Sequence, residues 1–354
     1  MSELLILSAL RLPASMPKLG LQQWDLLIRQ ARRGNLLARL HSLLAQAGLL
    51  DHVPYQPRQH LEWTRVTADR HAQAVRTEVA RIQQALSGQP VILLKGAAYV
   101  IAGLPPGAGR VFSDIDILVP KAQLLDVESA LLAHGWMASQ HDAYDQRYYR
   151  EWMHELPPLQ HMLRETTIDV HHAILPQTMA MHPDSNALRA AAVPLAGYQD
   201  LLVLAPTDMV LHSAAHLFYE SELFNGLRDL VDLDALLRHF SQTPEFWHQL
   251  TQRAGDLGLT RCLYYALRYT RMLLHTPIPP PVAAAIEDAR PPFPISAIMD
   301  VLYRRALLPD HASCVDHATF AARKCLYVRG NWLRMPPLKL ARHLFHKAFI
   351  SPRH

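Results

Sequence analysis

The chain has 354 residues, half of them apolar and 19% charged, with a formal net charge of +4 at pH 7. This composition excludes a disordered chain and provides enough apolar side chains for sizeable cores. At roughly 150 residues per domain, the length predicts two domains or one core with helical additions. The 26 prolines against 14 glycines favour helices separated by proline turns over a glycine-rich barrel or sandwich.

The sequence also bears on the location of the protein and on the class of its partners. Three cysteines are too few for a disulfide framework, and the residues after Met1 lack the basic and apolar regions of a signal peptide. We therefore expect a cytoplasmic protein. Because no apolar run approaches the ~20 residues that cross a bilayer, we expect no integral membrane segment. The net charge and the 21 histidines weakly favour an anionic partner.

Residues 1–89 are predicted to form an N-terminal helical region. Five leucines within residues 36–44 fall on one helical face, with Asn35 as the expected N-cap and Gly48 as the expected left-handed residue at the C-terminal end. A longer helical pattern follows and ends before Pro90. Its apolar stripe is expected in the core and consists of Trp63, Val66, Val75, Val79, Ile82 and Leu86.

Residues 90–205 are predicted to form a small α/β core. Short apolar runs bounded by turn residues indicate buried strands, and the segments between them suit helices. The expected elements are strands at residues 91–94 and 115–119, helices at residues 97–102 and 122–134, and a strand that begins at Trp136. Gly135 is expected to close the second helix in the left-handed conformation.

A β-hairpin is predicted later in this core. Residues 160–163 and 167–171 flank a polar turn and have the composition of two short strands. Side chains alternate between the two faces of a strand, so Thr167, Asp169 and His171 share one face.

Residues 206–354 are predicted to be helical again. Thr207 and Asp208 provide the N-cap expected for a helix at residues 209–219, and Thr243 provides that of a later helix. The sequence thus predicts an α+β fold, in which a small mixed β-sheet core is flanked by N- and C-terminal helical regions.

Three acidic residues and a lysine turn suggest a site in the core. Asp114 and Asp116 stand two residues apart at the start of a strand, so both carboxylates point to one face and can converge on a divalent cation. Upstream, Gly96 at the mouth of a helix leaves backbone N–H groups free to meet phosphate, and Lys95 adds positive charge. Asp169 supplies a third carboxylate from a neighbouring strand.

With these motifs the sequence resembles the DNA polymerase beta-like nucleotidyltransferase superfamily. Within it, the chain is similar to the bacterial family called uncharacterised nucleotidyltransferases, which pairs a Leu-Lys-Gly turn with an Arg-x-x-Ser-Asp-x-Asp strand and a later Asp-x-His. The similarity spans residues 91–172 and is softer in the flanking helices, where it includes His212, His216, Arg228 and Asp229.

The resemblance implies that Asp114, Asp116 and Asp169 are the catalytic residues and bind Mg²⁺ or Mn²⁺. Asp169 would also help to deprotonate the acceptor, either directly or through the metal. The implied contacts to a nucleoside triphosphate come from Lys95, Gly96, Ala97, Arg110, Ser113 and His171. The Lys-Gly-Ala turn stands where many superfamily members have Gly-Ser.

Several of these residues also admit structural roles. Arg110 is as well suited to pair with one of the two neighbouring aspartates as to bind phosphate. His171 could contact metal or phosphate, or could hold the end of its strand by a hydrogen bond. His212 and His216 are expected in the core or a pocket wall, because no Glu follows His212 as a metalloprotease motif requires.

The function implied by the resemblance is transfer of a nucleoside monophosphate from a triphosphate to a hydroxyl or phosphate, with release of pyrophosphate. The acceptor stays open between a small molecule, a peptide or protein, and an RNA end. Two alternatives are a catalytically degenerate binding module in a biosynthetic operon and an RNA-modifying, toxin-like transferase. The three carboxylates argue against the first, since a binding module need not keep them together against their repulsion. The second predicts a basic groove beside the site.

The positive charge is concentrated near the end of the sequence. Residues 315–354 contain eight Lys or Arg and one acidic residue, Asp316, so the rest of the chain is slightly acidic. Residues 339–347 are predicted to form either a solvated helix or a basic amphipathic helix that contacts an anionic acceptor or a membrane surface. Binding to nucleic acid would depend on this segment.

Overall fold

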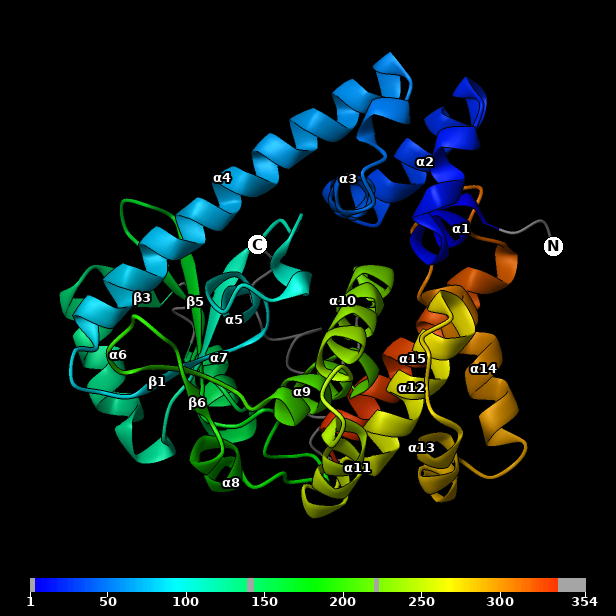
Figure 1. The fold of residues 1–354 in the computed structure, drawn as a ribbon. Coiled ribbons are helices and arrows are strands. Elements are labelled where there is room, and N and C mark those ends of the chain that lie inside the picture. The colour runs from blue at the N-terminus through cyan, green and yellow to red at the C-terminus, as the bar shows by residue number, and fades with distance from the viewer. Residues whose placement is uncertain (1–3, 139–142, 220–222, 337–354) are drawn as a thin grey trace.

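The computed structural model describes residues 4–138, 143–219 and 223–336, and the chain adopts the predicted α+β fold (Figure 1). A seven-stranded mixed sheet has the strand order β3-β4-β5-β2-β1-β7-β6. Its strands are β1 (Val91–Leu93), β2 (Asp114–Leu118), β3 (Trp136–Ala138), β4 (Leu159–His161), β5 (Thr167–His171), β6 (Val193–Pro194) and β7 (Leu201–Val203). The basic segment predicted at residues 339–347 lies outside the described residues.

The centre of the sheet is the parallel pair β2 and β5. Its register sets Asp116 opposite Asp169, while β1 runs antiparallel to β2 on the other side. β4 and β5 form the predicted hairpin, with Leu159 opposite Ile168. The first strand of that hairpin ends at His161, earlier than predicted, because Leu163 is 88% exposed in the turn.

Four helices precede the sheet in the chain. They are α1 (Leu5–Arg11), α2 (Leu21–Arg33), α3 (Leu37–Gln46) and α4 (Tyr55–Ala85). The predicted N-cap of α3 is wrong: Leu36 occupies that position, while Asn35 has a φ of +53° and its side-chain amide donates to Asn225 Oδ1 at 2.8 Å. Gly48 has the predicted left-handed conformation, with a φ of +67°.

The long helix α4 joins the N-terminal helices to the sheet (Figure 1). Its N-terminal half packs against α2 and α3, and its C-terminal half contacts α5 and α6. The predicted burial of Trp63 and Val66 is therefore wrong: these residues are 66% and 38% exposed, because this half of the helix extends away from the sheet. Val79 and Ile82, in the C-terminal half, are fully buried as predicted.

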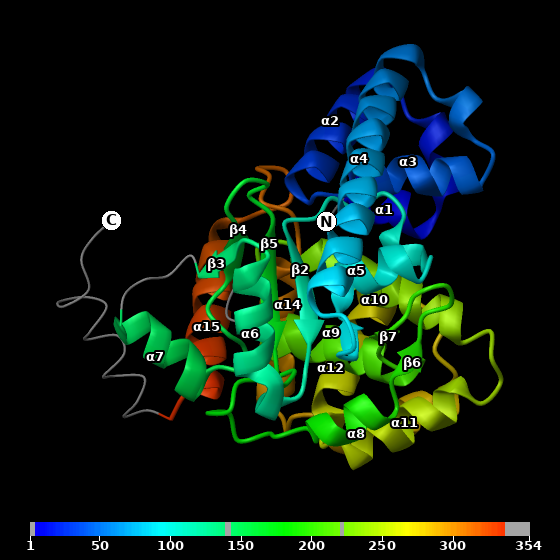
Figure 2. The same cartoon turned by 90° about the vertical axis from the view of Figure 1, so that its left-hand side faces the viewer.

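The remaining helices lie in and around the core or form the C-terminal region. The helices that follow β1 in and around the core are α5 (Lys95–Ile101), α6 (Leu124–Ala133), α7 (Ala143–Trp152) and α8 (Ser185–Ala190). The C-terminal helices are α9 (Pro206–Tyr219), α10 (Gly226–Phe240), α11 (Phe246–Asp256), α12 (Thr260–Leu274), α13 (Pro280–Ala285), α14 (Ile295–Ala306) and α15 (His317–Arg334). α6 and the end of α4 lie on one side of the sheet, with α9 and α12 on the other (Figure 2).

Two of the predicted helix starts in the C-terminal region are wrong. Helix α9 begins at Pro206, which suits the first helical position, so Thr207 and Asp208 lie inside the helix. Helix α11 begins at Phe246, with Glu245 rather than Thr243 at the N-cap position. No helix in the part of the chain that the structure describes is long and apolar enough to cross a membrane.

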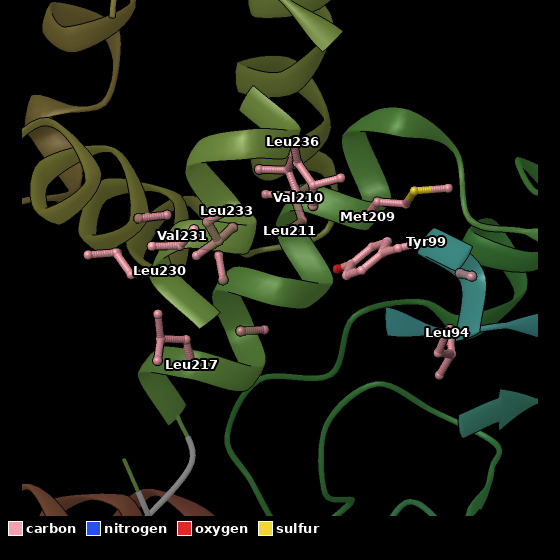
Figure 3. Close-up of a cluster of buried hydrophobic side chains, with 14 of the residues drawn as sticks. Leu94, Tyr99, Met209, Val210, Leu211, Leu217, Leu230, Val231, Leu233 and Leu236 are labelled. Carbon is pink, nitrogen blue, oxygen red and sulfur yellow. The ribbon is translucent and has the colours of Figure 1, made fainter. Parts of the chain in front are cut away.

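A continuous cluster of buried apolar side chains joins the N-terminal helices, the sheet and the C-terminal helices. Figure 3 shows part of it, where Tyr99 of α5 reaches toward α9 near Met209 and Val210. The Tyr99 hydroxyl shares a hydrogen bond of 2.6 Å with Ser213 Oγ. Helix α5 is therefore held between the sheet and the C-terminal helices, and this contact determines the position of the turn that precedes it.

We expect the buried ion pair between Asp208 and Arg253 to be a major determinant of stability. Asp208 is fully buried, and its carboxylate accepts hydrogen bonds from Arg253 Nε at 2.7 Å and from Nη2 at 2.8 Å. Asp208→Asn should lower the free energy of unfolding by about 3 kcal/mol, because it leaves a half-buried guanidinium without its anion. Urea denaturation measures this loss. Asp25→Asn, which breaks the exposed pair with Arg29, should change stability little, and equal effects of the two variants would contradict the expectation.

Candidate functional site

The turn between β1 and α5 has a strained backbone at Lys95. Its φ of +41° lies in the left-handed region, which costs a non-glycine residue about 1 kcal/mol or more. The lysine side chain is mostly buried, and its Nζ lies 3.8 Å from Asp116 Oδ2. The turn therefore brings a cation against the carboxylate on the neighbouring strand.

The loop before β2 packs closely against this turn. A Cβ on Gly96 would approach the Phe112 ring to 2.8 Å, so the absence of a side chain at this position allows the ring to pack there. His71 Nδ1 of α4 donates to the Phe112 carbonyl at 3.1 Å and holds the loop from the other side. Ser113 Oγ donates to Asp114 Oδ1 at 3.0 Å.

Three carboxylates converge where β2 and β5 run side by side. Asp114, Asp116 and Asp169 each offer an oxygen within 4.8 Å of the others. Asp116 is 8% exposed, Asp169 is half-buried and Asp114 is the most exposed of the three. Asp169 Oδ1 is buried and has no hydrogen-bond partner among the described residues. A carboxylate oxygen left in this state lacks a cation or a donor, and the three-oxygen set fits a hard divalent metal.

The electrostatics of the three carboxylates differ. Burial and the negative charge of Asp116 raise the pKa of Asp169 to about 7, and the same two causes raise the pKa of Asp114. The pKa of Asp116 lies well below its usual range: burial opposes this shift, but Lys95 and the hydrogen bond from His171 outweigh it. Asp116 therefore stays ionised, and its charge disfavours ionisation of the other two carboxyls. A divalent cation would remove this conflict.

His171 supports Asp116 from the end of β5. Its Nε2 donates to Asp116 Oδ1 at 3.0 Å, and its Nδ1 lies 3.3 Å from Glu155 Oε2. Burial lowers the pKa of His171, but the hydrogen bond to Asp116 and the charge of Glu155 outweigh it and raise the pKa overall. The alternative in which His171 holds the strand end by a hydrogen bond thus fits its position.

A cavity of about 200 Å³ opens beside Asp114 and Asp116. Its walls come from the β1–α5 turn, the loop before β2, and helices α9 and α10. They are lined by Lys95, Gly96, Tyr99, Arg110, Val111, Phe112, Ser113, Asp114, Asp116, Ser213, His216, Asn225, Arg228, Asp229 and Asp232. Cationic side chains and carboxylates therefore face the same space. A site that binds an anionic ligand together with a metal ion requires both, the cations for the ligand and the carboxylates for the metal.

Arg110 is held in the wall by a buried ionic network. Its guanidinium pairs with Asp232 of α10, which also accepts from Arg39 Nη2 at 3.4 Å. Arg39 in turn donates to the carbonyls of Pro105 at 2.5 Å and Pro106 at 2.6 Å. The alternative in which Arg110 pairs with Asp114 or Asp116 is therefore wrong, because a carboxylate on a distant helix takes that place.

The structure brings most of the predicted site residues to one place. Lys95, Gly96, Arg110 and Ser113 line the cavity with Asp114 and Asp116. Asp169 and His171 adjoin these aspartates without lining the cavity, through the three-carboxylate cluster and the Asp116 hydrogen bond respectively. Ala97 lies elsewhere: it is 1% exposed and belongs to the apolar core.

The two helical histidines on α9 have the expected positions. His212 is 3% exposed, and His216 lines the cavity wall. These placements agree with a core or pocket-wall role for both.

Sequence reasoning missed several residues of the cavity wall and of the ionic network behind it. Asp232 is a buried acid in the apolar-periodic α10, and Arg39 is a buried base in the leucine-rich α3. A charge on an apolar helical face was the signal that could have found both. Tyr99 and Asn225 carried no comparable signal, because their place in the wall depends on packing between distant helices.

The fold and the site together define an α+β protein whose mixed sheet carries a three-carboxylate cluster beside a cavity with cationic walls. The chain belongs to the family described as uncharacterised nucleotidyltransferase, whose model matches residues 21–275. This match begins at α2 and ends just after α12, so it includes the sheet and every residue of the cavity lining. The comparison with curated proteins finds no match, and neither does the comparison with solved structures.

Removal of the shared anion in the arginine network should be costly. Asp232→Asn leaves Arg39 and Arg110 buried without the anion that they share, so we expect the free energy of unfolding to fall by about 3 kcal/mol. Guanidinium denaturation followed by circular dichroism measures the change. Asp69→Asn removes an exposed acid paired with Arg65 and serves as the control, with little change expected. A stability of Asp232→Asn close to that of the control would show that the network does not hold the wall.

Proposed function

We propose that this protein is a Mg²⁺-dependent nucleotidyltransferase, which moves a nucleoside monophosphate from a triphosphate to an acceptor hydroxyl or phosphate and releases pyrophosphate. Membership of a nucleotidyltransferase family supports the general reaction. The observation that carries the proposal is the cluster of Asp114, Asp116 and Asp169 beside a cavity lined by Lys95 and Arg110.

The carboxylate cluster is the candidate metal site. Asp114, Asp116 and Asp169 would hold Mg²⁺ or Mn²⁺, since hard cations prefer carboxylate oxygens and Asp169 Oδ1 lacks a partner within the described chain. When bound, the metal would offset negative charge on the reacting phosphates and orient them. His171 and Lys95 hold Asp116 in its ionised form, which keeps it ready as a ligand.

Lys95 and Arg110 are the candidate ligands of the triphosphate. Both side chains are largely buried and face the cavity, where a charge-assisted hydrogen bond to phosphate is stronger than in water. Arg110 Nε is buried and has no hydrogen-bond partner in the described structure, so the guanidinium keeps a donor free for a ligand. Gly96 and Ser113 would offer a backbone N–H and a hydroxyl to the same phosphates.

Asp169 is the candidate base for the acceptor. It adjoins Asp116 across the parallel strands, within the same cluster as the two carboxylates of β2. From there it would accept the proton of the attacking hydroxyl, directly or through a metal-bound group. The acceptor itself is proposed only by class: a small molecule, a peptide or protein, or an RNA end.

Nucleotide transfer and nucleotide binding together test the proposal. The purified protein is incubated with each of the four α-labelled NTPs and Mg²⁺ or Mn²⁺, in the presence of a cell lysate as the source of acceptor. We expect label transfer to one class of acceptor and calorimetric binding of the same NTP. Asp114→Asn and Asp116→Asn should each reduce transfer at least about 100-fold, because each removes a metal ligand.

The matched control is Asp126→Asn, which changes an exposed aspartate on α6 and should leave transfer unchanged. Transfer that does not depend on Asp114 and Asp116 would contradict the enzyme assignment. NTP binding without transfer would instead favour the binding-module alternative.

The role of Lys95 leads to a separate expectation. Lys95→Gln should weaken NTP affinity about tenfold or more, because it removes a charge-assisted hydrogen bond from a largely buried position. Isothermal titration calorimetry at fixed Mg²⁺ measures the affinity. Lys18→Gln, at an exposed position, is the control for a simple loss of one positive charge. Equal affinity in both variants would argue against a phosphate contact by Lys95.

A further inference from the structure

A second cluster of metal-ligating side chains adjoins the three carboxylates. His154, Glu155 and His171 each offer a ligand atom, and these atoms lie within 4.8 Å of one another. Glu155 and His171 do not line the 200 Å³ cavity, and neither does His154. The cluster is thus separate from the space proposed for the nucleotide.

The backbone holds this cluster in a fixed arrangement. Glu155 forms an antiparallel bridge with His171, which sets their side chains next to each other across the strand. Two further backbone hydrogen bonds fasten the segment on both sides of Glu155: the N–H of His172 donates to the His154 carbonyl at 2.8 Å, and that of Leu156 donates to Val170 at 2.9 Å. A site built on such paired backbone is preorganised for a ligand.

The Nδ1 atoms of the two histidines lack hydrogen bonds to any described residue. His154 Nδ1 and His171 Nδ1 are both buried and without a hydrogen-bond partner in the described part of the chain. His171 already donates through Nε2 to Asp116, so Nδ1 is the ring nitrogen that faces the Glu155 carboxylate. The two unpartnered ring nitrogens and the Glu155 carboxylate therefore share one small space, in which a metal ion can satisfy both rings.

The distances favour a metal ion over a proton shared between His171 and Glu155. His171 Nδ1 and Glu155 Oε2 are 3.3 Å apart, longer than the roughly 2.8 Å of a charge-assisted hydrogen bond. Ligands bound tetrahedrally at about 2.0 Å from zinc are separated by about 3.3 Å. A shared proton would also leave His154 Nδ1 unsatisfied, whereas a metal can accept all three donors.

We propose that His154, Glu155 and His171 bind one zinc ion, at a site distinct from the Mg²⁺ site of the carboxylates. Two imidazole nitrogens and one carboxylate oxygen form a set that suits zinc and related transition metals better than Mg²⁺, and the fourth position is left for water or another ligand.

The zinc ion has a positioning role. It holds the His171 ring through Nδ1, while Nε2–H donates to Asp116. This is the carboxylate–histidine–zinc arrangement, in which a zinc-bound histidine donates its other ring N–H to a carboxylate. Asp116 is thereby oriented toward the cavity by a metal that does not itself touch the nucleotide. The inference concerns metal binding by the chain and does not depend on the transfer reaction.

Metal content and metal affinity test this site directly. The full-length protein is loaded with Zn²⁺ in the presence of excess Mg²⁺, dialysed, and analysed by plasma mass spectrometry. We expect about one zinc per chain in the unaltered protein and in Asp114→Asn. His154→Ala and Glu155→Gln should bind zinc at least tenfold more weakly. Substitution with Co²⁺ should produce the intense visible absorption of a tetrahedral site, which both cluster variants lose.

The controls separate this cluster from adventitious binding and from misfolding. His52→Ala removes an exposed histidine and should retain the zinc. Thermal unfolding monitors the fold of each variant, and the isosteric Glu155→Gln keeps the comparison informative where His154→Ala is destabilised. Mn²⁺ affinity of the carboxylate cluster, followed by electron paramagnetic resonance, should fall 10- to 100-fold after zinc removal, since Asp116 loses its support.

Three results would overturn the proposal. The first is the absence of zinc from the unaltered protein after loading. The second is zinc that persists in His154→Ala and in Glu155→Gln. The third is zinc that disappears in Asp114→Asn while both cluster variants keep it, because the carboxylate cluster would then be the zinc ligand.

Discussion

The parallel register of β2 and β5 is the constraint on which the site depends. It sets Asp116 beside Asp169 in the interior of the fold, where like charges repel more strongly than in water. The protein offsets this repulsion with two groups beside Asp116: Lys95 from the β1–α5 turn and His171 from the end of β5. The left-handed backbone of Lys95 is consistent with the need for a positive charge here, because the strained turn places the Lys95 ammonium group beside Asp116.

The same site is positioned by segments far apart in the chain. Helix α4 donates from His71 to the loop before β2, and its buried Glu78 pairs with Arg164 in the turn of the β4–β5 hairpin, with an Nη2–Oε1 distance of 2.6 Å. On the other side, Asp232 joins α10 to Arg39 of α3 and to Arg110. The cavity is therefore a product of the N-terminal helices, the sheet and the C-terminal helices together, and none of these parts forms its walls alone.

The sequence allowed prediction of those features that depend on local order. Short apolar runs located β1, β2 and the β4–β5 hairpin, and the spacing of Asp114 and Asp116 placed both carboxylates on one face. Contacts between distant residues could not be predicted, because periodicity carries no information on which helix meets which loop. For that reason the pairing of Arg110 with Asp232 was not foreseen and the exposure of Trp63 was mispredicted: each depends on where an element lies relative to the sheet.

His171 links the two clusters and shows how the polar interior is arranged. One ring nitrogen faces Asp116 and the other faces Glu155, so the orientation of the ring is coupled to both acids. A cation bound to one nitrogen of such a buried ring fixes the orientation of the ring, and thereby restrains the carboxylate that is hydrogen-bonded to the other nitrogen. The geometry of Asp116 is therefore determined by residues outside the cavity as well as by those that line it, and substitutions in the 154–155 segment should act on the carboxylate cluster without contact to its ligand.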